Sequence, residues 1–84
     1  MHINLNAMGT RMKRRRKELK MSQAELAEKV NVSNNHISSI ETGKQIPSLT
    51  TFVKICEQLD TTPDYLLLRS LHTDTLPKNI YDSL

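Results

Sequence analysis

The sequence predicts an all-α domain made of five short, closely packed helices. Apolar residues recur at intervals of three and four rather than alternating, which indicates amphipathic helices rather than strands. Side chains that favour helix starts stand in front of several of these segments. The 84 residues include 3 Pro, 2 Gly, one Phe and no Trp, so the core must be aliphatic. This length supports one domain with a modest core.

The first helix is expected over residues 6–19. Met8, Met12 and Leu19 lie within one apolar stripe, as the 3.6-residue period requires. Arg15 and Arg16 flank that stripe, so one of them is predicted to be partly buried and to need a carboxylate partner.

The second and third helices are expected to form a helix–turn–helix. Ser22 and Glu25 have the spacing of a capping box at the start of the second helix. Asn31 ends that helix, because Asn tolerates a left-handed turn. Ser33 caps the third helix, and Gly43 ends it. The two inner faces are apolar: Leu26, Ala27 and Val30, then Ile37 and Ile40.

The fourth helix is expected over residues 49–59, after the cap residue Ser48. Its predicted buried residues are Leu49, Phe52, Ile55, Cys56 and Leu59. Thr62 caps a short fifth helix that has Pro63 at its first position, where proline is favoured. A last short helix in the tail is suggested by the spacing of Leu76, Ile80 and Leu84.

Charge is unevenly distributed along the chain. Residues 1–20 contain seven basic and one acidic residue, whereas residues 21–84 contain five basic and eight acidic residues. A basic end on a mildly acidic body is typical of a surface that faces nucleic acid or anionic lipid, although a solvated charged face explains the same pattern. The opposing face of this basic helix carries Met rather than the Trp or Phe anchors of a membrane-surface helix.

Other function classes receive little support. The single Cys56 excludes an intramolecular disulfide and is expected to pack in the core. The chain contains no secretion signal and no apolar stretch long enough to span a membrane, so a cytoplasmic protein is predicted. Its three His are scattered, and no catalytic motif is present. We therefore expect no enzyme activity, no metal, no cofactor and no small-molecule effector site.

The stretch SQAELAEKVNVSNNHISSIETGKQIPSLTTFVKICEQLDTTPDYLL resembles the Cro/repressor-type helix–turn–helix family, also called the XRE family. The resemblance covers residues 8–68. It implies a lambda-repressor-like DNA-binding domain over 8–68, with its helix–turn–helix at about 22–42. A mobile arm over 1–7 would precede it, and a C-terminal tail over 69–84 would follow.

The resemblance also implies which residues contact DNA, because the family's third helix enters the major groove. The expected base-reading residues are Asn34, Asn35 and Ser39, with Ser38 and His36 accessory. The expected phosphate contacts are Gln23, Ser33, Thr42, Lys44, Arg11 and Lys13. Short hydrogen-bonding side chains suit this task, since Asn can bond adenine in bidentate fashion. An ordinary polar helix face is the competing interpretation.

Two further expectations follow from the resemblance. Arg16 is expected to pair with Glu41, which would fix the angle of the third helix. Arg15 stands where the family often has an apolar residue, so it should lie at the edge of the core with its charge outside.

The predicted function is a double-stranded DNA-binding transcriptional regulator, a repressor, acting as a homodimer on half-sites about 34 Å apart. The candidate dimer surface, for which packing of the tail on its own domain is equally plausible, comprises Tyr65, Leu67, Leu71, Leu76, Ile80 and Leu84. The alternative is a protein-interaction module, such as an antitoxin or an accessory partner of a larger regulator.

Overall fold

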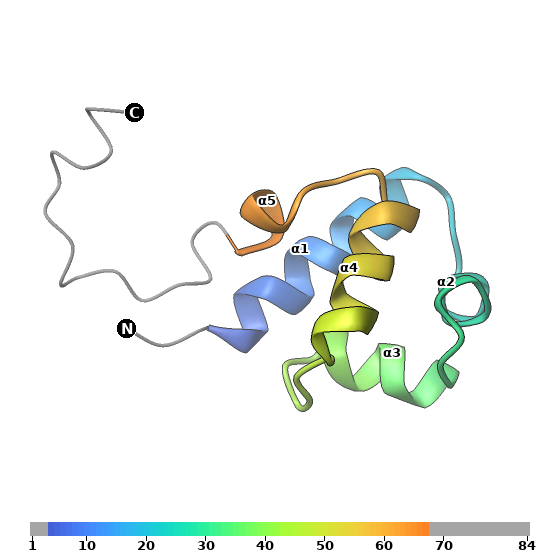
Figure 1. Cartoon of the computed structure of the whole chain (residues 1–84), viewed down its shortest axis with the longest axis horizontal. Coiled ribbons are helices and arrows are strands. Elements are labelled where there is room, and N and C mark those ends of the chain that lie inside the picture. The colour runs from blue at the N-terminus through green and yellow to red at the C-terminus, as the bar shows by residue number, and fades with distance from the viewer. Residues whose placement is uncertain (1–3, 68–84) are drawn as a thin grey trace, which may run out of the picture.

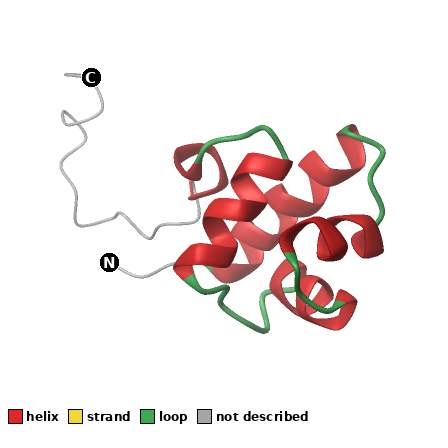
Figure 2. Cartoon of the chain, turned by 45° about the vertical axis from the view of Figure 1, so that its right-hand side comes forward, coloured by secondary structure: helices red, strands yellow, loops and turns green. Residues whose placement is uncertain are grey.

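The computed structural model describes residues 4–67, which form five helices. Their bounds are Leu5–Glu18 (α1), Gln23–Val30 (α2), Asn34–Glu41 (α3), Leu49–Gln58 (α4) and Pro63–Leu67 (α5). Within these residues every regular element is helical, which confirms the predicted fold class (Figure 2). No helix in this part of the chain is both long and apolar enough to cross a membrane.

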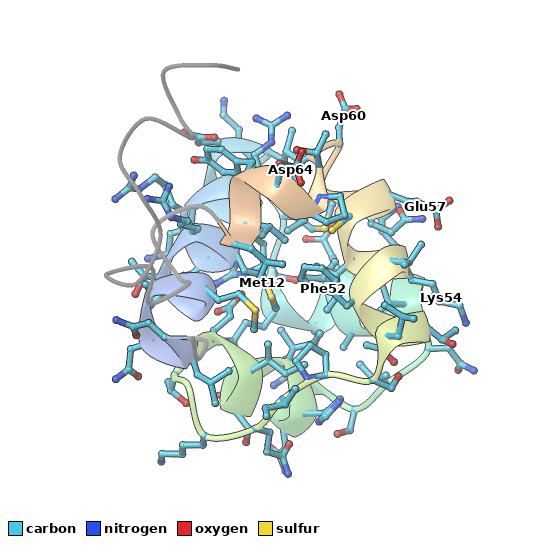
Figure 3. The ribbon with its side chains drawn as sticks, turned by 60° about the vertical axis from the view of Figure 1, so that its left-hand side comes forward. Met12, Phe52, Lys54, Glu57, Asp60 and Asp64 are labelled. Carbon is cyan, nitrogen blue, oxygen red and sulfur yellow. The ribbon has the colours of Figure 1, made fainter. Side chains whose placement is uncertain are left out.

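The helices pack around one small core. α1 contacts α3 and α5, α2 contacts α3 and α4, and α4 contacts α5, so that α3 lies at one edge of the domain (Figure 1). Met12 of α1 and Phe52 of α4 point into the interior, whereas Lys54 and Glu57 project outward from α4 (Figure 3). The buried core is aliphatic and sulfur-rich, as predicted: Met8, Met12, Leu26, Ala27, Val30, Ile37, Ile40, Ile55, Cys56, Leu59 and Leu66.

Helix starts agree with the sequence signals. The hydroxyl oxygens of Ser22, Ser33, Ser48 and Thr62 each accept a hydrogen bond from the backbone N–H three residues later. Each bond satisfies one of the donors that the first helical turn leaves without a partner inside the helix. The capping box at Ser22 is complete, because the Glu25 carboxylate also accepts from the Ser22 backbone N–H at 3.0 Å.

The first helix begins earlier than its apolar pattern indicates. Asn4 caps it by accepting from the Ala7 backbone N–H at 3.1 Å, so α1 starts at Leu5 rather than at residue 6. The arm expected over 1–7 is therefore too long, since residues 5–7 belong to α1. At the other end Leu19 is the C-cap and is exposed, instead of extending the buried stripe.

The prediction that Leu49 is buried is wrong. Its side chain is 78% exposed, and Val53, one turn further along the same face of α4, is also exposed. Leu49 opens the helix on the side that turns away from the core. Together with the exposed Ile46 it borders an open apolar groove whose other walls are Leu5, Met8, Pro47, Phe52 and Leu67.

Two side chains behave as their sequence context suggests. Burial raises the pKa of the Cys56 thiol, so this side chain stays protonated and packs as a small apolar residue.

Arg15 lies half-buried at the edge of the core and donates from Nε to the Leu59 carbonyl at 2.8 Å. Its guanidinium also reaches Glu18 at 3.3 Å, so the charge stays at the surface.

Candidate nucleic-acid interface

A tight turn sets the angle between α2 and α3. Asn31 takes the left-handed conformation (φ 59°), and the Val32 N–H donates back to the Ala27 carbonyl at 2.9 Å. Ser33 then caps α3, leaving three residues between the two helices. This geometry confirms the predicted helix–turn–helix.

The outer face of α3 is polar and open. Ile37 and Ile40 are fully buried and anchor the helix on the core. The predicted base-reading residues lie outside that anchor: Asn34 and Asn35 are exposed, and His36, Ser38 and Ser39 are half-buried. The structure therefore brings these five side chains onto one continuous helical surface.

An ion pair fixes the end of α3 to α1. Arg16 donates from Nε to Oε2 of Glu41 at 2.7 Å and from Nη2 to Oε1 at 3.2 Å. The two residues are 6% and 5% exposed. Nη1 of Arg16 also donates to the Met21 carbonyl at 2.7 Å, so the guanidinium is held on two sides. The expected Arg16–Glu41 pair is thus present, with the bidentate geometry that makes such pairs strong.

A glycine lets α1 and α3 approach each other closely at the same place. A methyl group added at Gly9 would lie 2.5 Å from the Ile40 carbonyl oxygen and would overlap that of Glu41. No side chain fits between the two backbones here. The last turn of α3 is thus held against α1 in two ways. Gly9 allows the two backbones to touch, and Arg16 binds the Glu41 carboxylate.

Because Glu41 is paired with Arg16 in the interior, the outer face of α3 carries no negative charge. Glu41 is the one acidic residue of α3, and it is buried against a guanidinium. The exposed and half-buried polar side chains of α3 are Asn, Ser and His. Because no carboxylate points outward from the helix, a polyanion can approach it without like-charge repulsion.

Three of the predicted phosphate-binding side chains already have partners. Gln23 donates from Nε2 to Oε1 of Glu41 at 3.0 Å, so its amide extends the buried network. The Ser33 hydroxyl oxygen accepts from the His36 N–H and still has a proton to donate. The Thr42 hydroxyl donates to the Ser38 carbonyl at 2.9 Å, so it has no proton left for a phosphate oxygen.

The basic residues of α1 are divided between its two flanks. Gly9 and Arg16 mark the flank that meets α3, and Lys13 lies on this side by the 100° step per residue. Arg11 lies on the opposite flank, with its guanidinium over the Tyr65 ring at 5.5 Å. Lys13 is consequently on the side of the candidate interface, and Arg11 is not.

The loop after α3 folds back onto that helix. The backbone N–H groups of Lys44 and Gln45 both donate to the Ser39 carbonyl, at 2.8 and 3.2 Å. Lys44 is exposed. Oε1 of the Gln45 side chain lies 2.7 Å from Nδ1 of His36, at hydrogen-bonding distance. Gln45 therefore borders the candidate surface. Sequence reasoning missed Gln45, because a lone loop Gln gives no periodic signal.

Comparisons with known proteins agree with this geometry. A family model described as helix-turn-helix matches residues 12–66. Repressor protein C2 of Salmonella phage P22 is 40% identical over 65 residues, which are 77% of this chain and 30% of the relative. The HTH-type transcriptional regulator ImmR of Bacillus subtilis (strain 168) is 31% identical over 83 residues, 93% of this chain and 65% of ImmR.

A solved structure shares the same fold. The crystal structure of the P22 c2 repressor protein in complex with a synthetic operator is 41% identical and aligns with a TM-score of 0.70. The alignment covers 73% of this chain and 92% of that one. The chain spans 30% and 65% of the lengths of the two curated relatives. The family model covers well over half of the sequence, and the chain therefore belongs to the Cro/repressor-type helix–turn–helix family.

Proposed function

We propose that this protein is a sequence-specific, double-stranded DNA-binding transcriptional regulator, acting as a repressor. The observation that carries the proposal is the outer face of α3: an open row of Asn and Ser whose one acid is buried on Arg16. The similar P22 protein is named a repressor and was crystallised with an operator. A cytoplasmic location and a non-catalytic role are part of the same proposal.

The proposed contacts divide into base reading and phosphate binding. Asn34, Asn35 and Ser39 would read base edges, with Ser38 and His36 beside them. Lys44, Lys13 and the Ser33 hydroxyl would bind phosphates on either side of α3. Gln23 keeps the second N–H of its amide group and the free backbone N–H groups of the first turn of α2 for this purpose. Thr42 is left out because its hydroxyl proton is already donated to the Ser38 carbonyl. Arg11 is left out because its guanidinium lies over Tyr65, on the flank of α1 away from α3.

The proposed assembly is a homodimer. One α3 offers few base contacts, and a two-fold axis doubles them while setting the half-site spacing. Of the predicted dimer residues, Tyr65 and Leu67 are half-buried, and Leu71, Leu76, Ile80 and Leu84 lie outside the described residues. The exposed Ile46, Leu49 and Val53 add apolar surface at and before the start of α4 that a second copy would cover.

A selection experiment tests the proposal. The chain is incubated with random duplexes at moderate salt, and the bound fragments are sequenced. We expect one enriched motif with two related half-sites. The affinity for that motif should then fall steeply as salt rises, because each phosphate contact releases a counterion. A library that stays random would contradict the proposal and favour the protein-interaction alternative.

Sedimentation of the free protein tests the assembly separately. We expect a concentration-dependent dimer, and Leu49→Ser should shift it toward monomer. A wild-type chain that stays monomeric both alone and on its motif would contradict the dimer while leaving the DNA-binding proposal intact.

A further inference from the structure

We propose that Gln45, in the loop after α3, determines base specificity together with His36. This inference rests on the proposed function and deepens it, because it adds a base-contacting residue that lies outside α3, the helix proposed to enter the major groove. The two side chains are nine positions apart and meet at 2.7 Å, between His36 Nδ1 and Gln45 Oε1. The pair forms one wall of an open hollow that is also lined by Val32, Ser33, Asn35 and Ser39.

The position of Gln45 is fixed at two points on α3. Its backbone N–H donates to the Ser39 carbonyl at 3.2 Å, and its amide oxygen contacts the His36 ring. Lys44 donates to the same carbonyl, so the loop cannot swing away from α3 without losing these bonds. A side chain already held in place loses less conformational entropy on binding than a free loop glutamine would.

The hydrogen-bond chemistry of the pair is directional. An amide oxygen only accepts, so with Oε1 facing the ring the proton lies on Nδ1 of His36. In the tautomer with its proton on Nδ1, the ring presents Nε2 as an acceptor, and the Gln45 NH₂ group keeps its donors. A base edge that offers a donor beside an acceptor matches this combination. In the major groove that edge is adenine, through N6 and N7.

A competing role for the pair is purely structural. If the His36–Gln45 contact served only to hold the loop, its loss would displace Lys44 and weaken binding to every sequence alike. Base reading instead changes the preference at one base pair and leaves the others intact. These two effects separate cleanly when affinity is measured for a full set of single-base variants.

The test uses the enriched motif of the wild-type chain and its single-base variants. Gln45→Met keeps the length of the side chain and removes its hydrogen bonds. We expect it to lower the discrimination at one base pair per half-site by about 5- to 150-fold. His36→Ala should affect the same base pair, and the double variant should lose little more than either single variant. Gln58→Met, at the exposed far end of α4, is the matched control.

Each outcome decides the inference. Uniform weakening by Gln45→Met, no change, or effects of the two variants at different base pairs would overturn it while leaving the proposed function in place. A wild-type chain that enriches no motif would overturn both. Melting curves of each variant identify any loss of folding, and Gln45→Asn, which keeps the amide on a shorter stem, provides a second probe with the same expected loss.

Discussion

The C-terminal end of α3, which is buried, and its open outer face differ in whether they contain charged side chains. At the buried end, Glu41 is held by Arg16 and Gln23 and has almost no contact with solvent. On the open face, the contact between His36 and Gln45 joins two side chains without a carboxylate. The buried ion pair thus fixes the position of α3, while side chains without a carboxylate form its open face. The comparison suggests that orientation and reading are carried by separate residues.

Removing the buried carboxylate should produce the largest effect. Glu41→Ala leaves the Arg16 guanidinium buried without its partner and the Gln23 amide without its acceptor. We expect a loss of about 3–5 kcal/mol in the free energy of unfolding. Thermal or urea unfolding measures it, with Glu57→Ala on the exposed face of α4 as the control.

The same variant tests whether orientation is separable from reading. Because Glu41 does not face outward, Glu41→Ala should weaken binding to every sequence in similar proportion and leave the preferred motif unchanged. A changed motif would contradict the separation of the two roles, and an unchanged melting temperature would contradict a stabilising buried pair.

Gly9→Ala should have the next largest effect on the free energy of unfolding. We expect it to destabilise the protein, whereas Gly→Ala in a helix usually stabilises. At an ordinary helical position, replacing Gly by Ala stabilises by about 0.5–1 kcal/mol. Here the added methyl would meet the Ile40 and Glu41 carbonyls, so α1 and α3 must separate. We expect a loss of about 1–3 kcal/mol, as in overpacked cores. Thr10→Ala, at the neighbouring exposed position, should be close to neutral.

Much of this arrangement was predictable from the sequence, and the exceptions have local causes. The helix–turn–helix, its caps and the Arg16–Glu41 pair follow from short-range signals or from the family resemblance. Leu49 was misplaced because apolar character alone does not say which side of a helix start meets the core. Gln45 and the Gln23–Glu41 bond depend on contacts between residues nine and eighteen positions apart, which no periodic pattern encodes.

Variants of the open face should separate base reading from phosphate binding. Asn35→Ala should reduce discrimination at one base pair by about 1–3 kcal/mol. Lys44→Ala should weaken all sequences alike and lower the slope of log affinity against log salt by about one unit. Fluorescence anisotropy over a salt series measures both. If Asn35→Ala also weakened all sequences equally, the face would bind DNA without reading it.

The smallest effect is expected at the start of α2, where a carboxylate is exposed rather than buried. The Ser22 backbone N–H donates to the Glu25 carboxylate and, with a smaller effect of the Ser22 side chain, lowers the pKa of that carboxyl below its ordinary value of 4.5. The ionised carboxylate is the form that accepts from the Ser22 N–H. Glu25→Gln should therefore reduce the melting temperature by only a few degrees at neutral pH.

The pH dependence of this small effect provides its own check. Because the folded-state pKa lies below the unfolded-state value, the stabilisation is fully present above the unfolded value and is lost as pH falls through the folded one. The wild-type advantage over Glu25→Gln should accordingly shrink as the pH is lowered from 7 past 4.5. Glu28→Gln, also exposed on α2 but outside the capping box, is the matched control. An advantage that persisted at acidic pH would mean that Glu25, unlike the buried Glu41, stabilises the fold through its shape or hydrogen bonds rather than through its charge.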